Sequence, residues 1–88
     1  MIRREVVVTN ALGLHARAAA KFVHLAGQFQ SRIGVTRGQR TVEGKSILGL
    51  LLLAAARGTT LVLTVEGADE AAAVAALTAL VERKFEDA

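Results

Sequence analysis

The 88-residue sequence contains no cysteine, tryptophan or tyrosine. Without cysteine the chain has no disulfide framework, no thiolate metal site and no cysteine nucleophile. Hydrophobic residues make up 52% of the chain, and most of them are Ala, Leu and Val, with three Phe. This share is too high for a disordered polypeptide. We therefore expect a single domain over residues 1–88, in which many small aliphatic side chains pack closely.

Long apolar segments are also missing. The run Ile47–Ala56 includes a glycine and is well short of the roughly 20 residues that a membrane-spanning helix needs. No apolar stretch of the length found in secretory signal peptides follows the first charged residues. The sequence therefore predicts a cytoplasmic protein without a membrane partner.

Charge is unevenly distributed along the chain. Residues 1–60 carry nine basic and two acidic side chains, whereas residues 61–88 carry two basic and six acidic ones, which together give the net charge of +3. Nucleic acid is disfavoured as a partner, because Trp and Tyr are absent and no basic run is longer than Arg3-Arg4. An acidic protein partner fits the basic part better.

The hydrophobic pattern predicts seven elements in the order β-α-β-β-α-β-α. Strands are expected over Arg4–Thr9, Ser31–Thr36, Gln39–Glu43 and Thr60–Glu66. Helices are expected from about Ala16 to Gly27, from Ser46 to about Leu53, and from the N-cap Asp69 to about Lys84. Short, half-buried strands in this order predict an α+β fold, in which a four-stranded, mostly antiparallel sheet carries three helices on one face.

The segment from Asn10 to Arg17 is the most informative for chemistry. It places His15 at a glycine-loosened junction between a loop and the first expected helix, with Arg17 two residues later. A helix N-terminus offers free N–H groups and partial positive charge, which suit a phosphate on His15, and Arg17 adds a charge-assisted contact. Neutral imidazole is also an effective nucleophile near neutral pH. The alternative is that His15 is a polar junction residue and Arg17 a surface charge.

The other histidine, His24, is interpreted as an ordinary surface or docking residue on the solvated face of the same helix, together with Arg17, Lys21 and Gln28. No metal site is expected, because the chain has only two histidines and no carboxylate stands near either in sequence.

A second group of residues surrounds the start of the second expected helix. Ser46 is expected to cap this helix, and a phosphate on its hydroxyl would be stabilised by the same helix end. Ile47, Leu48, Leu51 and Leu52 cover too much of a short helix for all to face inward. One or two of them should be exposed and form a protein docking surface. The alternative is that all four belong to the core.

Two motifs resemble those of a known family. Gly13-Leu14-His15-Ala16-Arg17 resembles the active-site signature of the histidine-containing phosphocarrier (HPr) family of bacterial sugar phosphotransferase systems, and Gly44-Lys45-Ser46-Ile47-Leu48-Gly49 resembles that family's regulatory serine segment. The spacing between the motifs, the length and the element order also fit. The resemblance implies an open-faced β-sandwich. It also implies a phosphoryl carrier rather than a stand-alone enzyme. This carrier is expected to need no cofactor and to be a monomer.

The resemblance also implies roles for individual residues and partners. His15 would accept a phosphoryl group from enzyme I and pass it to an enzyme II A domain, and Arg17 would stabilise the phosphate. Ser46 would be the target of an HPr kinase/phosphorylase, where one exists. The docking surface would comprise the apolar residues Ile47, Leu48 and Leu51 and the basic residues Arg17, Lys21 and Lys45.

One residue departs from the family pattern. Ala18 stands where the family usually has proline, which is favoured in a first helical turn because its fixed φ and missing N–H cost nothing there. Alanine at this place is similar to the HPr-like proteins of proteobacteria, including a nitrogen-related branch whose output is regulatory rather than sugar uptake. The other alternative to a phosphocarrier of sugar uptake is a regulatory domain of similar layout that binds a small ligand.

Overall fold

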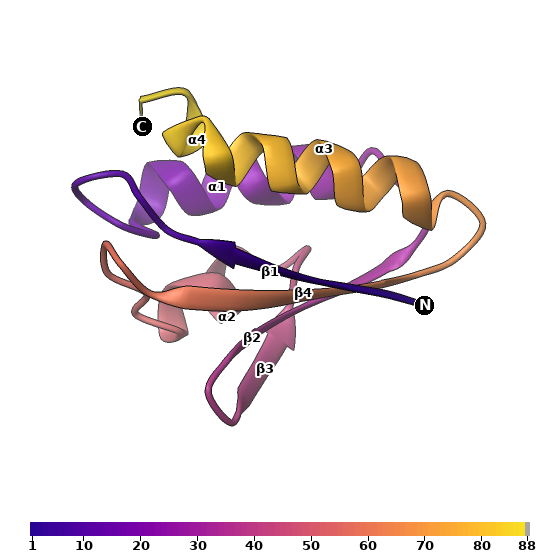
Figure 1. Cartoon of the computed structure of the whole chain (residues 1–88), viewed down its shortest axis with the longest axis horizontal. Coiled ribbons are helices and arrows are strands. Elements are labelled where there is room, and N and C mark those ends of the chain that lie inside the picture. The colour runs from indigo at the N-terminus through magenta and orange to yellow at the C-terminus, as the bar shows by residue number, and fades with distance from the viewer. Residues whose placement is uncertain (88) are drawn as a thin grey trace.

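The computed structural model describes residues 1–87, and the side chains of residues 1–86. The seven expected elements are present in the expected order, and a short turn follows them (Figure 1). The elements are β1 (Ile2–Val7), α1 (Ala16–Ala26), β2 (Arg32–Arg37), β3 (Arg40–Glu43), α2 (Ile47–Leu52), β4 (Thr60–Glu66), α3 (Glu70–Glu82) and the turn α4 (Lys84–Asp87).

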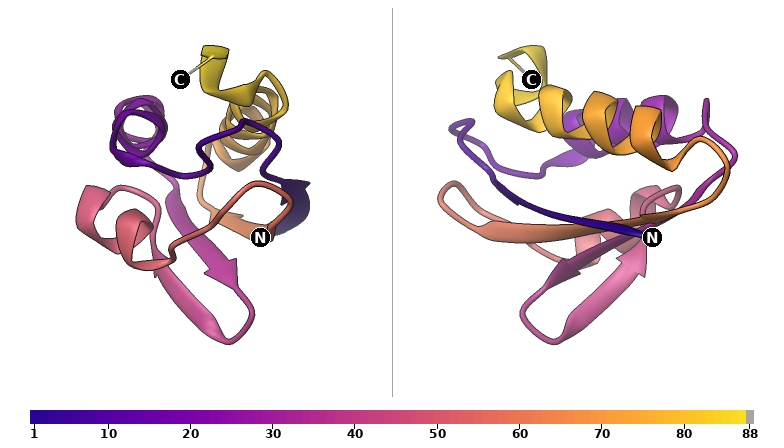
Figure 2. Two further views of the ribbon diagram at one scale, coloured as in Figure 1. Left: turned by 90° about the vertical axis from the view of Figure 1, so that its left-hand side faces the viewer. Right: turned by 45° about the vertical axis from the view of Figure 1, so that its right-hand side comes forward.

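The four strands form one antiparallel sheet in the order β1-β4-β2-β3. Alternate residues of a strand point to opposite faces, and in β4 the residues Leu61, Leu63 and Val65 are buried while those between them are partly exposed. The helices lie on the buried face, and the other face is left open in the described part of the chain (Figure 2). The predicted α+β fold with an open-faced, antiparallel sheet is confirmed.

The core lies between the sheet and the helices. The helices α1 and α3 lie side by side along the sheet (Figures 1 and 2), and α2 packs against α1 and β3. Each helix buries apolar side chains in this layer, with Phe22 from α1, Leu50 from α2 and Leu77 from α3. Among residues 1–87, no helix has the length and hydropathy that crossing a bilayer requires.

The first strand differs from the sequence prediction by two residues. It begins at Ile2, which pairs with Val65, and its ladder with β4 ends where Val7 meets Thr60. Val8 hydrogen-bonds instead to the loop before β4, because its N–H donates to the Thr59 carbonyl (2.9 Å) and its carbonyl accepts from Gly58 (2.7 Å). The charged start of β1 is tolerated because β1 is an edge strand with one open face.

The prediction that Asp69 is the N-cap residue of α3 is confirmed, but its side chain bonds elsewhere. Asp69 occupies the N-cap position, but its carboxylate makes no capping hydrogen bond. Instead the carboxylate accepts the N–H of Gln30 (2.8 Å), the N–H of Ser31 (3.0 Å) and the Ser31 hydroxyl. Glu70 supplies a local bond in its place, because its carboxylate accepts the N–H of Gly67 at 3.1 Å. Asp69 therefore ties the start of α3 to the loop between α1 and β2.

The end of the last helix also differs from the prediction. α3 ends at Glu82, and residues Lys84, Phe85 and Glu86 follow in the left-handed region, with φ of 57°, 52° and 56°. This turn buries the Phe85 side chain completely. The Phe85 carbonyl accepts a hydrogen bond from the ammonium of Lys21 in α1 (3.0 Å). Burial of an aromatic ring favours this turn over a longer helix.

Candidate functional site

The structure places His15 at the junction between the β1–α1 loop and α1. His15 is the N-cap residue of α1, with an extended backbone (φ −81°, ψ −177°), and its Nδ1 accepts the backbone N–H of Arg17 at 3.1 Å. Its carbonyl accepts the N–H of Ala19 at 2.8 Å. The imidazole therefore takes the place of the usual serine or aspartate cap at a helix start.

The two ring nitrogens of His15 have different surroundings. Because Nδ1 accepts a hydrogen bond, it carries the lone pair in the neutral ring, and the proton is on Nε2. Nε2 is enclosed and has no hydrogen-bond partner within the described residues. The nucleophilic lone pair thus lies on the nitrogen that faces the start of α1.

The loop that holds His15 is fixed by hydrogen bonds and by a close backbone approach. The Leu14 N–H donates to the Ala55 carbonyl (2.8 Å), and the side-chain amide of buried Asn10 donates to the Gly13 carbonyl (2.7 Å). Gly13 has a φ of +66°, and a Cβ on it would lie 2.5 Å from the Ala55 oxygen. The loop can therefore pack against residues 55–56 only with glycine at this position.

The positive end of α1 is open to an anion. The first turn of α1 contains no acidic residue, and the first N–H groups of a helix lack intrahelical acceptors. Arg17 is exposed, and its guanidinium makes no hydrogen bond or ion pair with another residue in the part of the chain that the structure describes. Ala18, which replaces the usual proline, is fully buried in the same turn. This arrangement suits a phosphate next to Nδ1 of His15.

Ser46 caps α2, as the sequence predicts. Its hydroxyl oxygen accepts the N–H of Gly49 at 3.0 Å, and its carbonyl accepts the N–H of Leu50 at 3.0 Å. A Cβ at Gly49 would lie 3.2 Å from Cβ of Val42, so the small residue lets α2 lie close to β3. The serine segment is therefore locally ordered by its own cap and by contact with the sheet.

The apolar residues of α2 are more exposed than the sequence predicts. Four of them form what we call the α2 patch. Their exposed fractions are 44% for Ile47, 69% for Leu48, 36% for Leu51 and 57% for Leu52. Leu50 alone in this helix is fully buried. The prediction of one or two exposed residues was too low, because Leu50 is the one residue of α2 that is buried.

The two lysines expected around this surface both contact backbone carbonyls. Lys21 donates to the Phe85 carbonyl, and Lys45 donates to the Phe29 carbonyl at 2.7 Å. Lys21 is half-buried, so its assignment to the solvated face of α1 needs correction, whereas Arg17 and His24 on that face are exposed. Each ammonium keeps two further N–H groups for an anionic partner.

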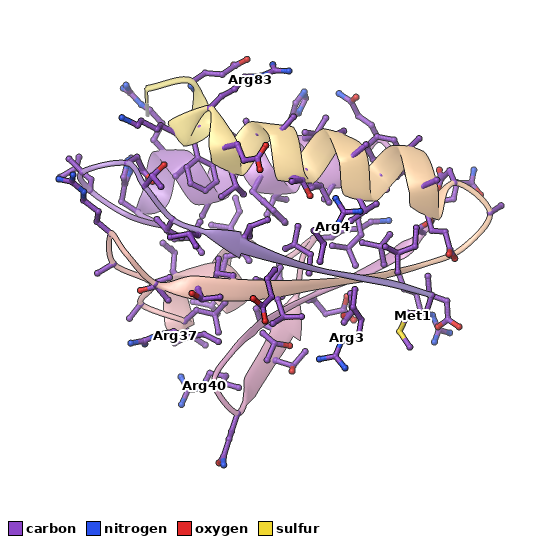
Figure 3. All side chains as sticks on the ribbon, viewed as in Figure 1. Met1, Arg3, Arg4, Arg37, Arg40 and Arg83 are labelled. Atoms are coloured by element: carbon purple, nitrogen blue, oxygen red, sulfur yellow. The ribbon has the colours of Figure 1, made fainter. Side chains whose placement is uncertain are left out.

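Two arginines that the sequence did not single out support α2 from the other end. Arg37 donates from Nη1 to the Leu53 carbonyl (2.8 Å), and Arg40 donates from Nη1 to the Leu52 carbonyl (3.0 Å). Both belong to the β2–β3 hairpin, and Figure 3 shows them near each other at the α2 side of the sheet. Cations at a helix C-terminus satisfy its free carbonyls. Their position on a separate hairpin hides this role from local patterns.

No group of three or more His, Cys, Asp or Glu side chains that could hold a metal ion lies within the described residues 1–87.

Comparison with known proteins identifies the family. The family model described as "PTS HPr component phosphorylation site" matches residues 2–83. The chain belongs to the HPr family of the phosphotransferase system. This is the family of phosphocarrier proteins whose two motifs the sequence resembles.

Relatives of the HPr family match nearly the whole chain. The phosphocarrier protein HPr of Neisseria meningitidis is 49% identical over 85 residues, which cover 97% of this chain and 96% of that protein. The phosphocarrier protein NPr of Shewanella violacea is 42% identical over 87 residues, which cover 99% and 96%. The crystal structure of HPr from Thermoanaerobacter tengcongensis superposes with a TM-score of 0.96 at 40% identity, covering 100% and 99%. The likeness in sequence and fold therefore extends over 97–100% of this chain.

Proposed function

We propose that this protein accepts a phosphoryl group on Nδ1 of His15 from enzyme I of a phosphotransferase system and passes it to an enzyme II A domain. The observation that carries this proposal is the hydrogen bond between Nδ1 and the N–H of Arg17 at a helix start that has no acidic residue. The nucleophilic nitrogen and the groups that stabilise a phosphate are thereby in the same place.

The proposed transfer is a displacement at phosphorus. The Nδ1 lone pair of His15 attacks the phosphorus of the phosphohistidine of enzyme I. As the new N–P bond forms, the donor N–P bond breaks and its electron pair returns to the donor imidazole. The N–H of Arg17 then loses its bond to the lone pair and becomes available to a phosphoryl oxygen. An acceptor histidine on the enzyme II A domain reverses these roles in the next step.

In this mechanism, Arg17 stabilises charge on the transferred group. Its guanidinium is exposed and is not engaged by another described residue, so it can contact the phosphoryl oxygens of either complex. Positioning and charge stabilisation supply most of the catalysis of phosphoryl transfer. A single cation beside the acceptor nitrogen is therefore sufficient for a relay that must run in both directions.

The docking of partners would use the α2 patch together with Arg17, Lys21 and Lys45. The patch has exposed aliphatic side chains on a helix that packs against α1, which starts at His15. Small interfaces of this kind are typical of transient complexes, in which complementary charge sets the association rate. Basic residues around an apolar centre favour acidic surfaces on enzyme I and on the enzyme II A domain.

The test is incubation with enzyme I and labelled phosphoenolpyruvate. We expect label that is lost in acid and kept in base, as for phosphohistidine. His15→Ala should take up no label, and His24→Ala, which removes the other histidine, should be labelled like wild type. Arg17→Glu should be labelled more slowly, because a carboxylate repels the phosphate. Label that persists in His15→Ala would overturn the assignment.

A second candidate is a nitrogen-related carrier that is not coupled to sugar uptake. It is supported by the 42% identity with the NPr of Shewanella violacea, and Ala18 is compatible with it. The two outputs are separated by measuring kcat/KM for phosphoryl transfer to sugar-specific and to nitrogen-related enzyme II A domains. Faster transfer to the nitrogen-related domain would select this candidate, and faster transfer to the sugar-specific domain would select the first.

We also propose that Ser46 is a regulatory phosphorylation site for an HPr kinase/phosphorylase. Its hydroxyl lies at the start of α2, next to Ile47 and Leu48 of the α2 patch. A phosphate there adds about 1.5 to 2 negative charges at neutral pH. The helix end accommodates this charge, whereas an acidic partner is repelled by it. Phosphorylation would thus weaken docking without unfolding the carrier.

A further inference from the structure

A groove of about 570 Å³ runs between α1 and α3, and no residue of the α2 patch lines it. The two helices lie side by side above the sheet, and α4 lies at one end of the pair (Figures 1 and 2). The volume falls within the range of about 300–1,000 Å³ that is typical of small-molecule sites. The groove is therefore large enough for a small ligand. It lies outside the α2 patch, although it shares Arg17 and Lys21 with the proposed docking surface.

The groove exists because its walls are built from short side chains. Ala20 lines it from α1, and Ala76 and Ala79 line it from α3, while Leu25 and Leu80 are its larger apolar residues. An alanine side chain ends at Cβ, so it cannot fill the space between two neighbouring helices. The lining therefore offers an apolar surface to the body of a ligand.

One end of the groove is strongly basic. α1 and α3 run in opposite directions (Figure 1), which brings Arg17 and Lys21 from the start of α1 near Arg83 after the end of α3. Figure 3 shows Arg83 at the α4 end of the helix pair. Glu86 is the one carboxylate in the lining, 3.8 Å from Nη1 of Arg83. Three cations thus face one anion, an excess that an anionic ligand group would neutralise.

Lys21, at the basic end of the groove, is held in place by a hydrogen bond. The ammonium of Lys21 donates one hydrogen bond to the Phe85 carbonyl, which leaves two N–H groups for a ligand. Arg17 and Arg83 are exposed, so the ligand's charged group stays close to water and little desolvation opposes binding. The basic end is therefore partly ordered before any ligand arrives.

We propose that this groove binds a small organic anion, a molecule with one phosphate, sulfonate or carboxylate group on a compact apolar body. The anionic group contacts Arg17, Lys21 and Arg83. The apolar body lies against Ala79 and Leu80. A neutral molecule of the same shape binds more weakly, because it leaves the excess positive charge at this end of the groove without compensation.

The probe for this site is 8-anilinonaphthalene-1-sulfonate, which has one sulfonate on an apolar body. The chain contains no tryptophan or tyrosine, so the fluorescence of the bound dye is measured against little protein background. We expect saturable binding at one site. The uncharged analogue N-phenyl-1-naphthylamine should bind about tenfold more weakly or worse, a difference of about 1.4 kcal/mol.

Two variants test the two halves of the groove. Ala79→Leu fills the apolar part, and Arg83→Gln removes a cation, and each should weaken dye binding about tenfold. The matched controls are Ala72→Leu, on the exposed face of α3, and Arg3→Gln, on the open face of the sheet, and both should bind like wild type. Circular dichroism checks folding, and Ala20→Leu fills the groove from the opposite helix if Ala79→Leu fails to fold.

Backbone amide chemical shifts locate the dye on the protein. The proposal predicts shifts in α1, in the second half of α3 and in α4. Absence of binding, equal affinity for the charged and uncharged probes, or shifts confined to the α2 patch would overturn it. Unchanged affinity of a folded filling variant would do the same.

Discussion

Gly13 shows how a single residue controls the geometry of the candidate site. Its φ of +66° lies in the left-handed region, and its missing Cβ lets the loop approach the Ala55 carbonyl and the Ala56 backbone. The next residue, Leu14, donates its N–H to the same Ala55 carbonyl. His15 follows directly, so any displacement of Gly13 is passed to the His15 imidazole.

The variant Gly13→Ala should therefore be less stable and slower as a phosphoryl acceptor. We expect a loss of about 2–4 kcal/mol in the free energy of unfolding, from left-handed strain and from steric clash together. Gly38→Ala is the matched control, because Gly38 has a similar φ of +61° but a Cβ on it would have no atom within 4 Å. It should lose about 1 kcal/mol from strain alone. Equal losses in urea unfolding would contradict the close approach.

At the scale of an element, α2 depends on contacts with the rest of the molecule. It has six residues, and a helix this short is not stable in isolation. Ser46 caps its start, Arg37 and Arg40 donate to the last carbonyls at its end, and Leu50 anchors it in the core. These four contacts hold the helix while its other apolar side chains stay exposed.

The variant Ser46→Asp separates capping from docking. Aspartate is also a good N-cap and its charge suits a helix start, so the unfolding free energy should stay within about 0.5 kcal/mol of wild type. Phosphorylation of His15 by enzyme I should be slower, and high salt should restore part of the rate. Gln39→Asp in the hairpin turn adds the same charge and should be phosphorylated like wild type. Equal rates for Ser46→Asp and wild type would leave Ser46 as a helix cap alone.

On α3, Thr78 has a hydroxyl that is enclosed and has no hydrogen-bond partner within the described residues. Thr78→Val keeps the shape of the side chain and removes the unpaired oxygen, so it should stabilise the protein by up to about 1 kcal/mol. Thr78→Ser keeps the hydroxyl and loses a buried methyl group, and it should destabilise by about 1 kcal/mol. Urea unfolding measures both changes. Destabilisation by Thr78→Val would show that the hydroxyl has a partner.

At the scale of the whole molecule, the candidate site lies at one end of the helix pair α1 and α3. The carboxylates of Asp69 and Glu70, with their hydrogen bonds and ion pair, lie at the other end. His15 lies where α1 begins, whereas Asp69 and Glu70 lie where α3 begins, at the other end of the helix pair (Figure 1). Asp69 accepts three hydrogen bonds from Gln30 and Ser31, and Glu70 forms an ion pair with the amino group of Met1 at 3.3 Å. The far end is thus held by carboxylates, whereas the loop at the end with His15 is held by hydrogen bonds between uncharged groups.

These ties predict a dependence of stability on pH. Hydrogen bonds from Ser31 and from the N–H of Gln30 lower the pKa of Asp69, and those from Gly67 and the N-terminal amino group lower the pKa of Glu70. A carboxylate with a lowered pKa in the folded state stabilises it above the unfolded pKa, and this stability is lost as pH falls through the folded pKa. We therefore expect a constant melting temperature from neutral pH to about pH 5 and a decline below about pH 4.

The contribution of Asp69 is measured with Asp69→Asn. This variant should melt at a lower temperature than wild type at pH 7 and should differ less from it at the lowest pH that still permits folding. Glu82→Gln removes one carboxylate from the exposed end of α3, where it makes no hydrogen bond or ion pair with another described residue, and should follow the wild-type curve. A parallel offset of Asp69→Asn at all pH values would contradict the role of ionisation.

Local patterns were sufficient for most elements and for the placement of His15 and Ser46. The strict alternation over Thr60–Glu66 matches β4, because one face of that strand meets the core and the other is open. His15 and Ser46 were found as helix starts because capping is set by a few neighbouring residues. Their roles in phosphoryl transfer and regulation stay predictions, since no structural feature measures chemistry directly.

The features that the sequence did not reveal all depend on distant contacts. Asp69 binds Ser31 rather than its own helix, and Lys21 binds the carbonyl of Phe85. The arginines of the β2–β3 hairpin reach the end of α2, and Phe85 enters the core through a left-handed turn. Periodicity reports which residues are apolar, and it does not report which polar group meets which backbone carbonyl across the fold.

The pairing of β1 with β4 has a consequence for the nascent chain during translation. β1 hydrogen-bonds in the sheet to β4 alone, although β4 is made much later. At about 5–20 residues per second, the roughly 50 residues between Val7 and Thr60 take about 3–10 s to synthesise. During this interval the first strand has no partner, and the charges of Arg3, Arg4 and Glu5 within it protect it from aggregation. The loop before His15 also hydrogen-bonds to Ala55, so it reaches its folded geometry only after that residue has been synthesised.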